Sequence, residues 1–85
     1  MNNKLSREEL IDLVNIIMNS GVDSKTGKEY TDSEVIRMVQ IFESNITSPD
    51  GSDLIFYPDL CGLKIDASAE EIVDAGLNYK AGENN

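Results

Sequence analysis

The chain has 85 residues, of which 16 are acidic and 7 basic, and its net charge of -9 corresponds to an isoelectric point near 4.2. This acidity argues against a nucleic acid or an anionic membrane as a partner and favours a basic protein surface, although acidity that only keeps a small protein soluble would look the same. The absence of histidine excludes a His-dependent catalytic triad, and a single cysteine excludes an intrachain disulfide.

Three helix starts are predicted by one repeated pattern, a hydroxyl residue followed three places later by Glu. This is the capping box, and it occurs at Ser6, Thr31 and Ser68. Apolar residues then recur at helical spacing: Leu10, Leu13, Val14, Ile17 and Met18; Val35, Met38, Val39, Phe42 and Ile46; Ile72, Val73, Ala75, Leu77 and Tyr79. We therefore expect helices at about 6–20, 31–47 and 68–80, the last weakened by Gly76, with residues 81–85 fraying.

A fourth, very short helix is predicted at about 52–57. Pro49 and Gly51 break the chain before it, Ser52 or Asp53 can cap it, and Pro58 ends it. No alternating strand pattern of useful length is present. The fold class predicted for residues 1–85 is therefore all-α, a single small domain built as a four-helix bundle with a very short third helix.

Two of the connections between the expected helices are long. Residues 21–30 form a polar loop, whereas residues 59–67 include Leu60, Cys61, Leu63 and Ile65. We expect this apolar segment to pack onto the protein. The polar first nine residues and the lack of an apolar run of about 18 residues predict neither a signal peptide nor a membrane span, so a reduced, cytoplasmic protein is expected.

The short helix cannot bury all of its large side chains, because successive residues differ by about 100° around a helix axis. Leu54 and Ile55 are expected in the core, which leaves Asp53 and at least one of Phe56 and Tyr57 facing solvent or a partner. On the second helix the expected outer residues are Ile36, Gln40 and Glu43, with Asp32 and Val39 as further candidates. Val35 fits either the core or the rim.

Residues 48–58, SPDGSDLIFYP, resemble the signature of the immunity proteins that neutralise nuclease colicins and pyocins. The run departs from that family at Ser48, where members usually have His, and at Phe56, where they usually have the first Tyr. Tyr79 falls where the family usually has Trp. In the family this run forms the third and shortest of four helices.

The resemblance implies a nuclease bacteriocin immunity protein with no catalytic residues, no metal and no cofactor. The implied partner is the nuclease domain of a cognate bacteriocin, an HNH-type DNase, whose basic DNA-binding surface beside the active site is covered. We expect the free protein to be a monomer. The matching contact positions are Asp53 and Tyr57 as principal residues, Ser52 and Phe56 beside them, and Val35, Ile36, Val39 and Glu43 as residues that select the partner.

A carrier or regulatory module is the alternative function. Residues 23–34 have the length of an EF-hand loop, but Lys25 and Gly27 offer no ligand and Lys28 replaces the required Gly. Acyl carrier proteins are also small, acidic and helical, with a phosphopantetheine Ser between Asp and Leu, yet here the order is Ser52, Asp53, Leu54. Both alternatives are disfavoured by these mismatches.

Overall fold

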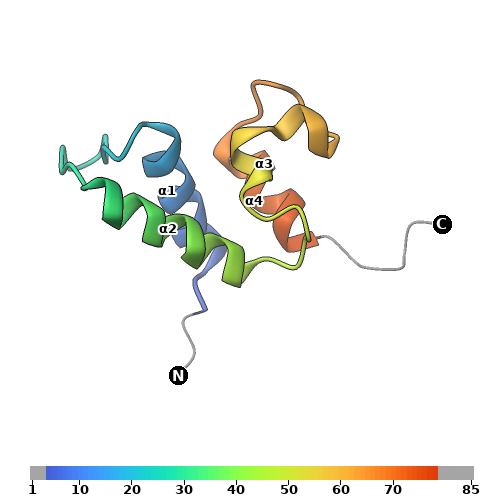
Figure 1. The fold of residues 1–85 in the computed structure, drawn as a ribbon, viewed down its shortest axis with the longest axis horizontal. Coiled ribbons are helices and arrows are strands. Elements are labelled where there is room, and N and C mark those ends of the chain that lie inside the picture. Colours follow the sequence, from blue (N-terminus) through green and yellow to red (C-terminus); the bar gives the residue numbers. More distant parts are fainter. Residues whose placement is uncertain (1–3, 79–85) are drawn as a thin grey trace.

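The computed structural model describes residues 4–78. Within this range the chain forms α1 (Arg7–Met18), α2 (Asp32–Asn45), α3 (Asp53–Phe56), a 3-10 helix η1 (Pro58–Cys61) and α4 (Ala69–Asn78), without a strand (Figure 1). The all-α prediction, with a very short third helix, is confirmed. Helix α1 packs on both α2 and α4, and α3 packs on α4. Tyr79 and the expected fraying tail lie outside the described residues.

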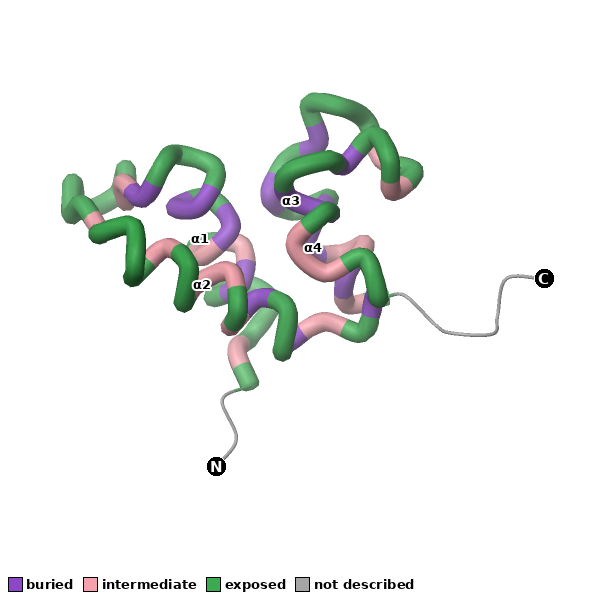
Figure 2. The backbone as a smooth tube through the Cα atoms, viewed as in Figure 1, coloured by how far each residue is buried: buried purple, intermediate pink, exposed green. Residues whose placement is uncertain are grey.

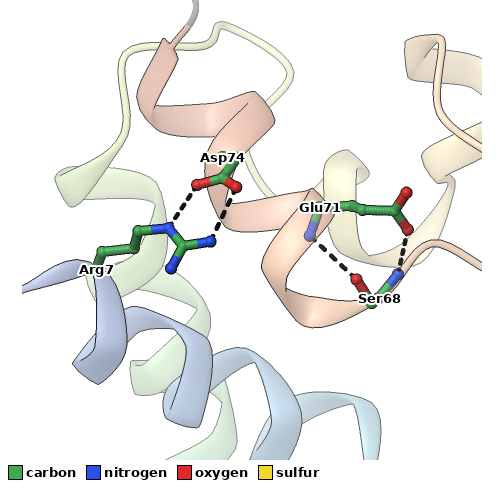
Figure 3. A network of polar contacts seen from close by, with 4 residues as sticks. All are labelled: Arg7, Ser68, Glu71 and Asp74. Atoms are coloured by element: carbon green, nitrogen blue, oxygen red, sulfur yellow. Dashed lines mark hydrogen bonds and ion pairs between the residues drawn. The ribbon is translucent and has the colours of Figure 1, made fainter.

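All three predicted helix starts are capping boxes in the structure. At the start of α4 the Ser68 hydroxyl accepts a hydrogen bond from the Glu71 N–H at 3.2 Å, and the Glu71 carboxylate accepts one from the Ser68 N–H at 2.9 Å (Figure 3). The same reciprocal bonds join Ser6 with Glu9 and Thr31 with Glu34. Each pair satisfies backbone donors that a helix start otherwise leaves unpaired.

The core gathers apolar residues from all four α-helices (Figure 2). Its buried members are Leu10, Val14, Ile17, Phe42, Leu54, Ile55, Ala67, Ala69, Ile72 and Val73. Met18 was expected among them, and that expectation is wrong, because Met18 is the last residue of α1 and is 46% exposed. Ile16, which the periodicity did not single out, is buried instead.

Gly76 of α4 lies against Ile46, the residue that follows α2. A Cβ atom placed on it would stand 2.7 Å from Cγ2 of Ile46. The Gly76 carbonyl also accepts hydrogen bonds from the Thr47 N–H at 3.0 Å and the Thr47 hydroxyl at 3.1 Å. Gly76 was expected to weaken the last helix because glycine is a poor helix former. In the structure it allows the segment after α2 to pack closely on α4.

A paired arginine joins the first helix to the last. Arg7 donates from Nε to Oδ1 of Asp74 at 2.7 Å and from Nη2 to Oδ2 at 3.0 Å (Figure 3). These hydrogen bonds lower the pKa of the Asp74 carboxyl. Both side chains remain about half exposed, so the pair orients α1 on α4 without being buried.

The segment between α3 and α4 packs down only in part. Cys61 and Leu63 pack against the core and Ala67 is buried, as expected, but Leu60 and Ile65 are each 78% exposed. The expectation is therefore wrong for these two residues. A single 3-10 turn brings residues i and i+3 onto one side, so when buried Pro58 and half-buried Cys61 face the core, Leu60 does not.

Candidate partner-binding surface

A tight turn positions α3 after the end of α2. The Ser48 hydroxyl accepts a hydrogen bond from the Asp50 N–H at 3.2 Å, and the Ser48 carbonyl accepts one from the Gly51 N–H at 3.4 Å. Gly51 has a φ of +56°, a left-handed conformation that glycine adopts without a steric penalty. Ser48 is buried in this turn. The turn reverses the chain so that a helix as short as α3 can lie on α4.

Helix α3 divides its side chains sharply between core and solvent. Leu54 and Ile55 are buried, whereas Asp53 is exposed and Phe56 and Tyr57 are 52% and 56% exposed. The spacing around the helix required at least one exposed aromatic, and both are exposed. Two buried aliphatic side chains therefore hold a helix whose other face presents two aromatic rings and a carboxylate.

Glu43 of α2 caps the start of α3. Its Oε2 atom accepts a hydrogen bond from the Ser52 N–H at 3.1 Å, and a Cβ atom on Gly51 would stand 3.0 Å from the same oxygen. Of the two expected caps, Ser52 and Asp53, it is Ser52 that occupies the N-cap position, but its side chain makes no capping hydrogen bond. A carboxylate at a helix N-terminus also interacts favourably with the free N–H groups there. Glu43 is therefore exposed to solvent and at the same time holds the start of α3.

The outer side of α2 adjoins α3 through this contact. Ile36 is 59% exposed, and Gln40 and Glu43 are exposed at the following helical positions. Val35 and Val39 are only partly exposed and pack against the core. The sequence left open whether Val35 belongs to the core or to the rim, and its side chain is in fact half-buried. Val39 was a candidate for the outer side of α2, but it too is half-buried.

Three carboxylates act on the thiol that follows α3. The pKa of Cys61 is raised, first by burial and then by the negative charges of Asp50, Asp53 and Asp59. These carboxylates come from the turn before α3, from α3 and from η1. Asp50, Asp53 and Asp59 are also exposed, so this stretch of the surface carries negative charge that suits a basic partner.

The residues that suggested a calcium loop have other roles. The Asp23 carboxylate accepts a hydrogen bond from the Lys25 N–H at 2.9 Å, and Glu34 belongs to the capping box of α2. Among residues 4–78, no three or more His, Cys, Asp or Glu side chains gather in a way that could hold a metal ion. Nor does any helix in this range have the length and apolar character needed to cross a membrane.

Comparison with known proteins identifies a family. The family model for colicin immunity protein / pyocin immunity protein matches residues 2–82. The chain is also 39% identical, over 77 residues, to a Bacillus subtilis (strain 168) protein described as uncharacterized protein YezA, an alignment that covers 91% of this chain and 94% of that protein. No solved structure matches the chain significantly.

Proposed function

Because the chain belongs to the colicin and pyocin immunity protein family, we propose that it binds and inhibits the nuclease domain of a cognate bacteriocin. The partner is an HNH-type DNase whose basic DNA-binding surface, next to the active site, is covered in the complex. The protein acts as a non-catalytic inhibitor without a cofactor, in the cytoplasm of the cell that makes the toxin.

The observation that carries this proposal is the exposure of Asp53, Phe56 and Tyr57 on a short helix fixed from behind. Two exposed aromatic rings beside carboxylates are unusual on a small monomer and typical of a binding surface. Leu54 and Ile55 anchor α3 in the core, and Glu43 holds its first turn. A surface held in this way loses little conformational entropy when it binds.

Each residue of the surface has a definite role in the proposed complex. Asp53 accepts charge-assisted hydrogen bonds from the basic nuclease, and Tyr57, a residue type common among interface hot spots, buries flat apolar area with Phe56. Phe56 does so without the hydroxyl that the usual Tyr would provide. Ser52 lies at the edge of this cluster.

The outer side of α2 provides selectivity in this proposal. Ile36 is its most exposed apolar residue, while half-buried Val35 and Val39 determine how α2 rests on the core. Glu43 contributes negative field and also fixes α3. Replacing Ile36 with Asn is expected to change the ranking among nuclease partners without changing stability, because the side chain is solvated in the free protein.

The experiment measures binding and inhibition with nuclease domains inactivated by substitution. The first is the nuclease domain encoded beside the immunity gene, and two domains from unrelated bacteriocins serve as comparisons. We expect tight binding by calorimetric titration to the first, inhibition of its active form, and weaker binding to the others. Asp53→Ala/Tyr57→Ala, a folded variant lacking the two principal contacts, is the control.

An absence of binding and inhibition toward every nuclease domain would contradict the proposal. An acyl carrier would instead gain a phosphopantetheine group on Ser52, visible by mass spectrometry. A calcium-responsive module would show heat on calcium titration.

A further inference from the structure

Exposed apolar residues are concentrated in the stretch from the end of the proposed binding helix to the segment before α4. Of the six large hydrophobic residues exposed in the described part of the chain, four fall within ten residues: Phe56, Tyr57, Leu60 and Ile65. The other two, Met18 and Ile36, lie on separate helices. Singly scattered apolar residues need no explanation, but a local concentration indicates a surface that is covered by a partner.

Leu60 is held close to Tyr57 by backbone geometry. The Tyr57 N–H donates to the Asp53 carbonyl at 2.7 Å, and the Leu60 N–H donates to the Tyr57 carbonyl at 3.0 Å. Helix α3 therefore leads into η1 without an intervening loop (Figure 1). Leu60 thus lies one hydrogen-bonded turn after Tyr57, and its side chain is exposed like that of Tyr57, whereas Pro58 is buried.

The charge around Leu60 identifies the kind of partner. Asp53 and Asp59 are exposed on either side of this turn, and the whole chain carries a net charge of -9. A second copy of the same chain would bring like charges together across such a contact, which is unfavourable. A basic surface with an apolar depression fits both the leucine and the carboxylates.

We propose that Leu60 extends the binding surface of α3 and inserts into an apolar depression of the same basic nuclease domain, next to the ring of Tyr57. This inference rests on the proposed function and adds to it a contact from η1. Pro58 and Cys61 anchor the turn while Leu60 makes the contact. The partner thus binds the continuous run of α3 and η1 rather than α3 alone.

The test compares three variants in calorimetric titration with the inactivated nuclease domain encoded beside the immunity gene. Leu60→Ala is expected to weaken binding by roughly 10- to 100-fold, the effect of losing most of one buried leucine side chain. Met18→Ala, which also truncates an exposed apolar side chain but at the last residue of α1, is expected to bind like the wild type. Tyr57→Ala reports separately on α3.

The outcomes separate this inference from the proposed function. If the wild type binds and Tyr57→Ala weakens binding while Leu60→Ala changes it less than about twofold, the extension is wrong and the proposed function stands. If the wild type binds no nuclease domain, both fail. If sedimentation finds a dimer of the free protein that Leu60→Ala dissociates, with nuclease binding unchanged, Leu60 serves self-association and the inference is overturned.

Discussion

The carboxylate of Glu43 accepts a hydrogen bond from the backbone N–H of Ser52 at 3.1 Å, across nine residues of sequence. This bond fixes the first turn of α3 to the face of α2 that carries Ile36 and Gln40. The two helices proposed to bind the partner are therefore coupled by one side chain. Glu43 positions the binding helix in addition to supplying negative charge.

Glu43→Gln and Glu43→Ala are expected to differ. Gln keeps an oxygen that can accept the Ser52 bond, so its stability should remain near that of the wild type. Ala leaves the start of α3 uncapped and should lower the free energy of unfolding by about 1 kcal/mol, the usual cost of losing a helix cap. Urea denaturation measures both. Equal stability of the two variants would mean that the bond contributes nothing.

Gly51→Ala is expected to destabilise the protein more than Gly27→Ala. Both glycines have positive φ, a backbone conformation that costs a residue with a Cβ about 1–2 kcal/mol. A Cβ on Gly27 has no atom within 4 Å, whereas one on Gly51 meets the Glu43 carboxylate at 3.0 Å. When Glu43 is also replaced by Ala, the destabilisation caused by Gly51→Ala should fall to about that caused by Gly27→Ala. Denaturation of the two double variants would establish or refute this.

Substitutions in α3 should separate binding from stability. Tyr57→Ala and Asp53→Ala are each expected to weaken nuclease binding by about 2–4 kcal/mol while leaving unfolding almost unchanged, since both side chains are exposed. Leu54→Ala should instead lower stability by about 2–5 kcal/mol, because it opens a cavity in the core. Calorimetric titration and urea denaturation on the same samples provide the comparison.

One result would assign Tyr57 to the core instead. That result is a loss of stability in Tyr57→Ala as large as that in Leu54→Ala, together with normal binding by the folded fraction.

Gly76→Ala is expected to destabilise the protein although Ala is the better helix former. The gain in helix propensity is about 1 kcal/mol, but the added methyl group would overlap Ile46 at 2.7 Å, and overpacking costs about 1–3 kcal/mol. In an Ile46→Ala background, which removes the overlapping atoms, Gly76→Ala should become stabilising. Thermal unfolding of the four proteins would decide whether this change of sign occurs.

Stability should depend on pH through Asp74. The hydrogen bonds from Arg7 lower the pKa of Asp74 below its ordinary value of 3.8, so the folded protein binds fewer protons there than the unfolded chain. The resulting stabilisation is present above pH 3.8 and is lost as the pH falls through the folded-state pKa. Asp74→Asn should therefore be less stable than the wild type at pH 7, and the difference should disappear in acid.

Denaturation across this pH range, with Arg7→Gln as the partner variant, measures the effect. A difference between wild type and Asp74→Asn that persisted below the folded-state pKa would show that another interaction of Asp74 is responsible.

The sequence by itself determined the features that depend on neighbouring residues. Each capping box needs only residues three places apart, so the starts at Ser6, Thr31 and Ser68 could be predicted. The 100° advance per residue likewise required that at least one aromatic residue of the short third helix be exposed, and both Phe56 and Tyr57 are. The resemblance of residues 48–58 indicated the family that the match over residues 2–82 identifies.

Only the tertiary structure decided the contacts between distant segments. Glu43 reads in the sequence as an ordinary surface carboxylate, and its bond to Ser52 exists because the turn at Gly51 returns the chain to α2. From the sequence, Gly76 only weakens the helix that contains it, and the structure shows that Ile46 leaves no room there for a side chain. Leu60 was expected to pack onto the protein because it is apolar, but the 3-10 turn that buries Pro58 leaves Leu60 exposed. Composition specifies which residues can be buried, whereas the path of the backbone determines which of them are.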